Sequence, residues 1–355
     1  MKRAPETTVK LADVTTMGVG GRAARFVRAG SSGDVIGLVA AADTEETPVL
    51  LLGGGSNMIV SDAGFEGLVI QPTGRDGTEA QLPDGSHLLD YNAGMNWDEL
   101  VAETVERGLS GIEALSGIPG SLGAAPMQNI GAYGQEAASA IRAVSVYDRE
   151  LGRTRLFSNQ DCDFSYRNSV FKHTARYVVL SVQLKLTPSE LSRPVRYSEL
   201  AAKLGIGVGE SAPLREVRQA VLELRRGKGM VLDPTDPDTR SAGSFFLNPI
   251  VPAEVAAGLP EGAPRFPAAD GRVKLSAAWL IEHAGFSKGY SGGRKEVALS
   301  SKHTLAITNR GGASASQVVE LAAEIRAGVL EAFGVRLEPE PRLIGIALPD
   351  GVEVA

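Results

Sequence analysis

The chain has 355 residues, of which 43% are hydrophobic and 22% are charged, as in ordinary soluble globular proteins. This length exceeds what one domain needs and predicts two or three. The formal net charge of -6 argues against nucleic acid as the main partner. A single cysteine, Cys162, excludes an internal disulfide and a thiolate metal cluster, and we expect no metal site.

The apolar runs and the start of the chain bear on its location. No apolar run approaches the roughly 20 residues that a bilayer-spanning helix needs. The first six residues, Met1 to Glu6, lack the apolar core of a secretory signal. We therefore expect a cytoplasmic protein that does not bind a membrane.

The first part of the chain alternates strand and helix signals. Short apolar runs predict strands at residues 25–27, 48–52, 58–60 and 67–70. Ser31 and Ser32 offer caps for a helix whose apolar residues recur at helical spacing. A second helix is predicted from Asn96, which forms a capping-box pattern with Glu99, to a stop at Gly108.

The rest of the chain begins with an irregular segment from Ser110 to Gly134, which has no clear period. Further strands are predicted at residues 141–147, 153–157, 177–186 and 343–346. Further helices are predicted from Leu214 to a stop at Gly227, at residues 275–284 and at residues 317–333. A stretch rich in Pro and Asp, Asp233 to Asp238, suits a linker or domain boundary. Strands and helices mix without a regular βαβ period, so the predicted fold class is α+β.

Two glycine motifs occur in the first sixty residues. Gly18 to Ala23 matches the fingerprint G-x-G-x-x-A, but the following residues are predicted strand, so we reject a Rossmann fold. Gly53-Gly54-Gly55 follows a buried strand, where successive backbone N–H groups can face one anion, and Ser56 and Asn57 add donors. A plain tight turn is the alternative, but three consecutive glycines exceed what a turn needs and favour phosphate binding.

A longer stretch of small residues runs from Gly117 to Pro126. Small side chains allow a flat ligand to lie against the backbone, and Gln128, Asn129 and Tyr133 then supply polar contacts. A buried loop packed tightly against a helix has the same composition. On this stretch alone, both interpretations stay open.

Three other segments carry polar or charged groups. Arg167 lies among aromatic residues, which strengthen the attraction of a guanidinium for a carboxylate; a surface arginine stacked on a tyrosine is the alternative. Ser244 lies between a glycine and two phenylalanines, but no motif links it to a histidine base, and a serine at the start of a strand fits as well. The basic cluster Arg225 to Lys228 either complements a helix end or binds a diphosphate.

The order of these blocks along the chain is more specific than any one of them. They are Gly53 to Asn57, Ile118 to Gly134, Tyr166 to Ser169, Ala242 to Phe246, and Pro339-Glu340. This series closely resembles the UDP-N-acetylenolpyruvoylglucosamine reductases, also called UDP-N-acetylmuramate dehydrogenases, from about Thr15 to about Gly345. The second and fourth blocks are specific to that family, whereas the triple glycine is shared with other flavoproteins of the vanillyl-alcohol-oxidase type.

The resemblance implies a two-part FAD-binding region of the vanillyl-alcohol-oxidase type plus a C-terminal α+β substrate domain. The implied bounds are 1–71 with the tail 342–355, then 72–228, then 229–341. FAD would bind non-covalently. The implied cofactor-binding residues are Gly53, Gly54, Gly55, Ser56, Asn57, Ile118, Pro119, Gly120, Ser121, Gly123, Ala124, Gln128, Asn129, Gly131, Ala132 and Tyr133.

The resemblance also implies a reaction. NADPH would reduce the flavin, and the flavin N5 would pass hydride to C3 of the enolpyruvyl ether of UDP-N-acetylglucosamine. The product, UDP-N-acetylmuramate, is a peptidoglycan precursor, so the activity would serve cell-wall synthesis, cell shape and division. Adding hydride pushes charge into the substrate carboxylate, where Arg167 and Glu340 resemble the residues that stabilise it. Glu340 can assist only if it is protonated, which burial favours. Ser244 resembles the donor of a proton to C2.

Four further residues match the family's substrate contacts, namely Tyr166, Tyr197, Lys228 and Asn248. Tyr197 resembles the tyrosine of a loop found only in the longer of two family types, and so places the chain with that type. We expect a monomer.

Two departures and two rival functions bear on this assignment. Pro341 follows Glu340 where the family commonly has valine, which removes a backbone donor. Lys302 and His303 stand where relatives carry an amide contact to the substrate. A flavin oxidase of the same fold is one rival, and it would lack the Gly-Ser-Phe-Phe block. A binding protein without catalysis is the other, and the presence of all three catalytic candidates disfavours it.

Overall fold

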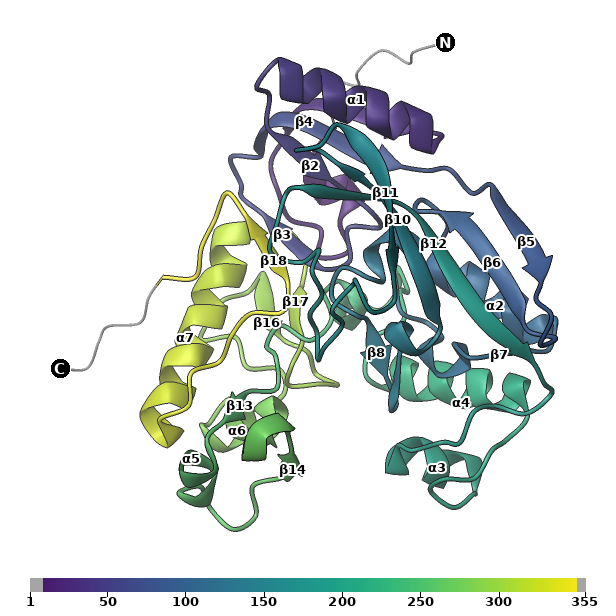
Figure 1. Ribbon diagram of the computed structural model, residues 1–355. Helices are drawn as coiled ribbons and strands as arrows, with labels where there is room; N and C mark the ends of the chain where they lie inside the picture. The colour runs from purple at the N-terminus through teal and green to yellow at the C-terminus, as the bar shows by residue number, and fades with distance from the viewer. Residues whose placement is uncertain (1–8, 350–355) are drawn as a thin grey trace. The chain divides into compact units, whose positions relative to one another are not determined.

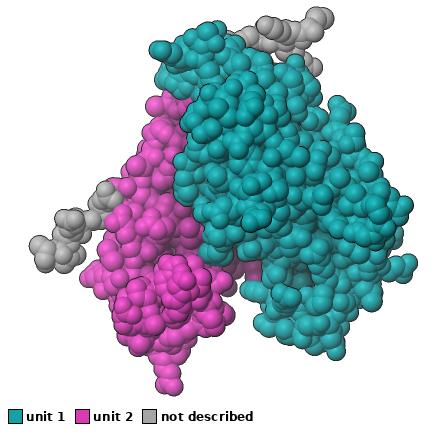
Figure 2. Space-filling view, viewed as in Figure 1, with its two compact units in different colours: residues 1–8, 23–54, 66–227 teal, residues 9–22, 55–65, 228–355 magenta. Residues whose placement is uncertain are grey.

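The computed structural model describes residues 9–349 (Figure 1). Residues 1–6, on which the expectation of no secretory signal rests, lie outside this range. The chain forms two compact units, coloured separately in Figure 2. Unit 1 contains residues 23–54 and 66–227, and unit 2 contains residues 9–22, 55–65 and the described chain from 228 onward. The division at residues 71, 228 and 341 stays a prediction.

One end of unit 1 is a three-stranded sheet covered by a helix. The strands are ordered β1 (Ala23–Ala29), β4 (Phe65–Pro72), β2 (Val49–Leu51), and β2 runs parallel to β4. Helix α1 (Ser32–Thr44) begins where the Ser31 hydroxyl accepts from the N–H of Asp34 (3.1 Å). It buries Val35 and Val39 in one cluster with Leu68 of β4.

The larger part of unit 1 is a six-stranded sheet in the order β11-β10-β12-β6-β5, with β7 on one end of β12. All its pairings are antiparallel. The bounds are β5 (Gly77–Gln81), β6 (His87–Asn92), β7 (Leu109–Ser110), β10 (Ile141–Asp148), β11 (Arg153–Ser158) and β12 (Tyr177–Pro188). Helix α2 (Trp97–Glu106) buries Trp97 and Leu100 in the same core as Val144 and Val182 of the sheet.

The remaining helices of unit 1 are α3 (Ser198–Leu204) and α4 (Leu214–Gly227). They share a small core in which Leu200 of α3 meets Val217 and Val221 of α4. Between α2 and β10 the chain is irregular, as predicted. It forms short 3-10 turns at Glu113–Leu115 and Leu122–Ala124, and a two-residue pairing of β8 (Gly131–Ala132) with β9 (Gln135–Glu136).

Unit 2 is built around helix α7 (Ala315–Phe333), which buries Val318, Leu321 and Ile325. A capping box between Ser314 and Gln317 begins this helix. The other elements are β3 (Met58–Val60), β13 (Ile250–Val251), α5 (Ala253–Ala257), β14 (Arg265–Pro267), β15 (Val273–Leu275), α6 (Ala277–His283), β16 (Val297–Leu299), β17 (Ile307–Asn309) and β18 (Arg342–Ile344). Strand β18 pairs in parallel with β3, and β16 pairs with β17 as a hairpin.

The mixture of separate sheets and helices confirms the α+β class. The change of unit falls at Gly227–Lys228, shortly before the stretch Asp233 to Asp238 that was predicted as a linker or domain boundary; the stretch itself lies in unit 2, with Asp238 only 3% exposed. Within residues 9–349, no helix is both long and apolar enough to cross a membrane.

Candidate active site

The loop after β2 comes very close to the backbone of the small-residue stretch in unit 1. A Cβ on Gly54 would lie 2.6 Å from the Cα of Gly120, and one on Gly53 would lie 2.5 Å from the hydroxyl of Ser121. Real Cβ atoms essentially never come so close. Glycine is therefore required for steric reasons at Gly54, where the neighbouring atom is backbone, whereas at Gly53 the neighbouring atom is a side-chain hydroxyl.

The small-residue stretch is itself fixed to the end of β6 and the start of α2. The carbonyl of Gly120 accepts from the N–H of Trp97 (3.1 Å), and the N–H of Gly123 donates to the carbonyl of Ala93 (2.9 Å). A Cβ on Gly123 would lie 2.5 Å from that of Ala93. Backbone contacts without intervening side chains thus define the shape of this stretch.

A partly buried carboxylate ties the start of the stretch to two helices. Asp98, near the N-terminus of α2, accepts from the N–H of Gly117 (2.6 Å) and from both terminal nitrogens of Arg218 on α4 (2.6 and 3.0 Å). Burial alone would raise the pKa of Asp98, but these hydrogen bonds hold it below its ordinary value. The carboxylate therefore remains charged at neutral pH and keeps the loop attached.

The continuation of the loop, from Gly55, belongs to unit 2. Gly55 has φ +63°, and a Cβ there would lie 2.2 Å from the carbonyl oxygen of Val14. The N–H of Thr16 donates to the carbonyl of Gly55 (3.0 Å). Gly54 and Gly55 thus meet other backbone at distances that exclude a side chain, whereas Gly53 meets the side chain of Ser121.

These features fit the FAD that the sequence predicts. A diphosphate is bound by backbone N–H groups that no Cβ screens, and Gly53, Gly54 and Gly120 provide bare backbone on adjoining segments. The residues that would hold the cofactor are those predicted at 53–57 and 118–133. Their individual contacts with FAD stay predictions.

Asn129, which is predicted to bind the cofactor, has its side chain hydrogen-bonded within the protein. Its side chain is only 1% exposed, and its amide nitrogen donates to the Glu136 carboxylate (2.9 Å) and to the carbonyl of Ser165 (3.2 Å). Its amide oxygen accepts from the N–H of Ala138 (2.9 Å). The side chain therefore braces the protein, and its predicted cofactor contact stays a prediction.

Arg167 occupies a strained turn. Ser165 and Asn168 exchange backbone hydrogen bonds (3.1 and 3.2 Å) around Tyr166 and Arg167, and Arg167 has φ +52°. A left-handed conformation costs a residue with a Cβ roughly 1–2 kcal/mol, so glycine or asparagine is usual there. Such strain clusters at functional sites, and its presence supports a role for this arginine.

The guanidinium of Arg167 has a defined position within unit 1. Its Nη2 donates to the carbonyl of Gly131 (2.7 Å), and its Cζ lies 5.5 Å from the centroid of the Tyr166 ring. A Cβ on Gly131 would lie 2.9 Å from Nη1 of Arg167. Gly131, predicted to bind the cofactor, is therefore also the residue that makes room for the arginine.

Tyr133 and Tyr197, predicted to bind cofactor and substrate respectively, are in contact. Their rings meet edge to face with centroids 5.5 Å apart, although Tyr197 is 43% exposed. Burial raises the pKa of Tyr133 to about 12, although the nearby charge of Arg225 acts to lower it. Tyr133 is consequently a neutral hydrogen-bonding group at any physiological pH.

Arg225 begins the basic cluster that the sequence offers as either a helix-end complement or a diphosphate site, and of that cluster only Lys228 is among the implied substrate contacts. The side chain of Arg225 is buried, and that burial lowers its pKa, although the nearby Tyr133 and the charge of Asp98 act in the opposite direction. The signal was present: Val217, Val221 and Arg225 are spaced four apart, so the arginine continues the buried stripe of α4. A buried arginine beside predicted cofactor and substrate residues is a further site candidate.

Unit 2 brings Ser244 and Glu340 onto two adjacent extended segments. The N–H of Glu340 donates to the carbonyl of Phe245 (2.8 Å), and the N–H of Leu247 donates to the carbonyl of Glu338 (3.0 Å). Pro341 is buried and follows this ladder, so its missing N–H does not interrupt it. Arg342 resumes the pairing by donating to the carbonyl of Asn57 (3.0 Å). The backbone position of Glu340 is thus fixed despite the proline.

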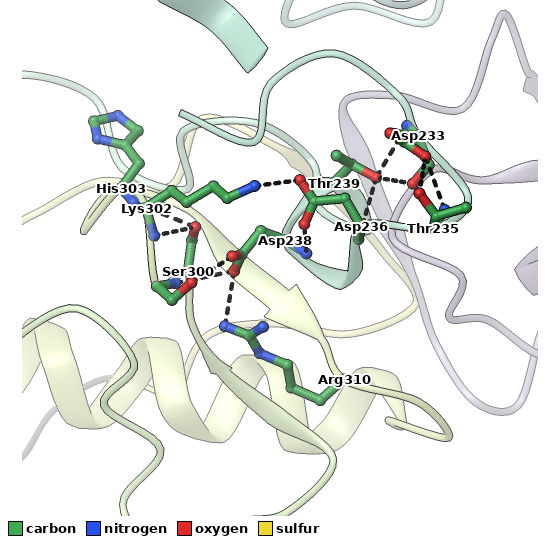
Figure 3. Close-up of polar contacts among 10 residues, drawn as sticks. Asp233, Thr235, Asp236, Asp238, Thr239, Ser300, Lys302, His303 and Arg310 are labelled. Carbon is green, nitrogen blue, oxygen red and sulfur yellow. Dashed lines mark hydrogen bonds and ion pairs between the residues drawn. The ribbon is translucent and has the colours of Figure 1, made fainter. Parts of the chain in front are cut away.

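The segment leading to Ser244 is anchored by the polar cluster drawn in Figure 3. Asp238 accepts from the N–H and hydroxyl of Ser301 (2.9 and 2.5 Å) and pairs with Arg310 (2.8 Å). Burial would raise the pKa of Asp238, but these groups hold it low. Asp236 pairs with Lys302 at 2.5 Å, which raises the pKa of that lysine. The Pro/Asp-rich stretch is therefore a structural anchor.

The other substrate candidates of unit 2 are half-buried. The amide oxygen of Asn248 accepts from the N–H of Ala277 at the start of α6 (2.9 Å), which fixes the orientation of this side chain. Lys228 is the first residue of the unit after α4. His303 donates its backbone N–H to the Ser300 hydroxyl (3.2 Å). Their substrate contacts stay predictions.

Comparison with known proteins follows the same division. Residues 23–155 match the FAD binding domain family, and residues 233–344 match the family described as UDP-N-acetylenolpyruvoylglucosamine reductase, C-terminal domain. A UDP-N-acetylenolpyruvoylglucosamine reductase of Thermobifida fusca is 52% identical over 96% of this chain and 98% of its own length. One of Streptomyces coelicolor is 50% identical over 95% of this chain and 90% of its own.

A solved structure agrees. The crystal structure of UDP-N-acetylenolpyruvylglucosamine reductase from Thermus caldophilus superposes with a TM-score of 0.65 and 27% identity, covering 95% of this chain and 97% of that one. Together these matches confirm the predicted FAD cofactor and the pairing of an FAD-binding region with a C-terminal substrate domain. The chain belongs to the UDP-N-acetylenolpyruvoylglucosamine reductase family.

Proposed function

We propose that this protein reduces the enolpyruvyl ether of UDP-N-acetylglucosamine to UDP-N-acetylmuramate with electrons from NADPH, as an FAD oxidoreductase of peptidoglycan precursor synthesis. The single observation that carries the proposal is the ladder of unit 2, which holds the backbones of Ser244 and Glu340 together by a 2.8 Å hydrogen bond between Glu340 and Phe245. A serine and a glutamate at one place suit a reaction that needs an acid and an anion-stabilising group.

FAD, for which Gly53 to Asn57 and the small-residue stretch are the predicted binding residues, would supply two-electron hydride chemistry between NADPH and the double bond when bound. The residues of this chain deal with the charge and the proton. As C3 of the enolpyruvyl group is reduced, negative charge develops on the substrate carboxylate. Arg167 stabilises this charge with its guanidinium, and Glu340 does so as a protonated hydrogen-bond donor.

Ser244 then donates its hydroxyl proton to C2. A serine is a poor acid in water, but the enolate carbon is strongly basic, so the transfer is favourable. Tyr166, Tyr197, Lys228 and Asn248 bind the remainder of the substrate. We place the enzyme in the cytoplasm, where nucleotide sugars and NADPH are available, and expect a monomer, which light scattering of the holoenzyme would test.

The proposal is tested by an anaerobic titration of the purified holoenzyme. NADPH should bleach the flavin absorption, and the UDP-linked enolpyruvyl sugar should then restore it with formation of UDP-N-acetylmuramate. A flavin that bleaches but is not reoxidised by the sugar would defeat the substrate assignment. A flavin that NADPH does not bleach would defeat the assignment of the reductant.

A further inference from the structure

The turn that carries Arg167 is held by groups outside the turn. The carbonyl of Arg167 accepts from the ammonium of Lys172 at 2.8 Å, and the carbonyl of Ser165 accepts from Asn129. The hydroxyl of Ser169 donates to the carbonyl of Met127 (2.8 Å) and attaches the chain just after the turn. A strained backbone persists only when its surroundings over-determine it, and these contacts do so.

Lys172 is the one of these groups that brings a charge to Arg167 itself. A charged donor makes a stronger hydrogen bond to a carbonyl than a neutral one does. The bond fixes the plane of the peptide after Arg167, and this plane sets the direction in which the arginine side chain leaves the backbone. The guanidinium is then held at its far end by the carbonyl of Gly131 (2.7 Å).

We infer that Lys172 is a positioning residue for Arg167: it clamps the left-handed turn so that the guanidinium points where the substrate carboxylate binds. This inference rests on the proposed function, which assigns the carboxylate to Arg167. Lys172 itself touches neither substrate nor cofactor in this scheme. Its effect must therefore pass through Arg167, and that makes the inference testable.

The experiment is a double-mutant cycle on the holoenzyme with Lys172→Met, Arg167→Lys and the double variant. The rate measured is reoxidation of the NADPH-reduced flavin by the enolpyruvyl sugar in anaerobic stopped flow. Lys172→Met should slow this rate about 10- to 100-fold in the otherwise unchanged chain. In the Arg167→Lys background the same change should cost less than about twofold, because the residues act as a unit.

Further measurements separate positioning from general stability. Lys172→Arg should recover most of the rate, since it restores a charged donor. The Kd for FAD and the thermal midpoint of the FAD-free protein should be close to those of the unchanged protein in all variants. Lys185→Met is the matched control: Lys185 forms an exposed ion pair with Asp84 (2.6 Å) on the same unit, and its loss should leave the rate unchanged.

Each outcome decides the question. An unchanged reoxidation rate in Lys172→Met, or an equal loss in both backgrounds, would overturn the inference while leaving the proposed function intact. If the sugar does not reoxidise the NADPH-reduced flavin of the unsubstituted protein, the proposed function and the inference are both overturned. If Lys172→Met does not fold, Lys172→Gln, which keeps a neutral donor, must show the same coupling to Arg167 or the inference is wrong.

Discussion

Replacing Gly54 with alanine is the sharpest test of the cofactor site. The new Cβ would lie 2.6 Å from the Cα of Gly120 and 3.2 Å from its carbonyl carbon, whereas ordinary contacts are 3.4–4 Å. One of the two backbones must therefore move by about 1 Å. The backbone of Gly120 is held in place, because its carbonyl accepts a hydrogen bond from the N–H of Trp97. The loop after β2 is then the part that shifts.

The size of the effect follows from overpacking. Inserting a methyl group into close-packed structure costs about 1–3 kcal/mol. If the loop moves away to relieve this strain, its N–H groups leave the positions that bind a diphosphate. At 1.4 kcal/mol per tenfold, the Kd for FAD should rise by about 5- to 150-fold.

The assay is a titration of FAD-free protein by flavin fluorescence, with urea unfolding of the same samples. Gly37→Ala is the matched control: it lies inside α1, where a Cβ would meet no atom within 4 Å. A glycine-to-alanine change within a helix should raise stability by about 0.5–1 kcal/mol and leave the Kd for FAD unchanged. If Gly54→Ala bound FAD as tightly as the unchanged protein with the same unfolding free energy, the close approach would have no bearing on cofactor binding.

Three further predictions concern the catalytic and anchoring residues. Ser244→Ala should keep FAD and substrate affinity but slow flavin reoxidation by the sugar about 100- to 10,000-fold, and undiminished turnover would reject the proton-donor role. Asp98→Asn removes a carboxylate whose folded-state pKa is lowered, so it should lose about 1 kcal/mol of unfolding free energy at pH 7, after allowing for solvent screening. In urea titrations, the difference in unfolding free energy between Asp98→Asn and the unchanged protein should disappear as the pH falls from about 4 through the folded-state pKa of Asp98. A pH-independent difference would contradict this prediction. Gly131→Ala should push the Arg167 guanidinium aside and slow reoxidation about tenfold, and it should lower the unfolding midpoint slightly, because the new Cβ would also lie 3.0 Å from the backbone oxygen of Gln135.

The strongly patterned parts of the fold were predictable from sequence. The helix predicted over residues 317–333 is α7, and the strand predicted over residues 141–147 is β10. Strand β5 was missed because its five residues are all exposed and so carry no alternation of apolar and polar side chains. The small strands of unit 2, β13 to β17, are two or three residues long, which is too short for any period to show.

The residue types of the site were predictable from the sequence, but their arrangement in space was not. Consecutive glycines predicted bare backbone at Gly54, yet nothing local could indicate that Gly120 would be its neighbour. The conformation of Arg167 breaks the local preference for glycine or asparagine, so propensity argues against what the structure adopts. The burial of Asp238, within the stretch predicted as a linker or domain boundary, was not predictable because a buried polar anchor and a solvated linker use the same residue types.

The two units use the same device to hold their active-site segments. In unit 1, Asp98 ties the small-residue stretch through the N–H of Gly117, and in unit 2, Asp238 ties the segment that leads to Ser244 through Ser301. Burial would raise the pKa of both carboxylates, yet hydrogen bonds and an arginine keep the pKa of each below its ordinary value. Both anchors are therefore intact at neutral pH and are released only in acid. Loss of activity on acidification should accordingly include a structural component, separate from the titration of any group that reacts with the substrate.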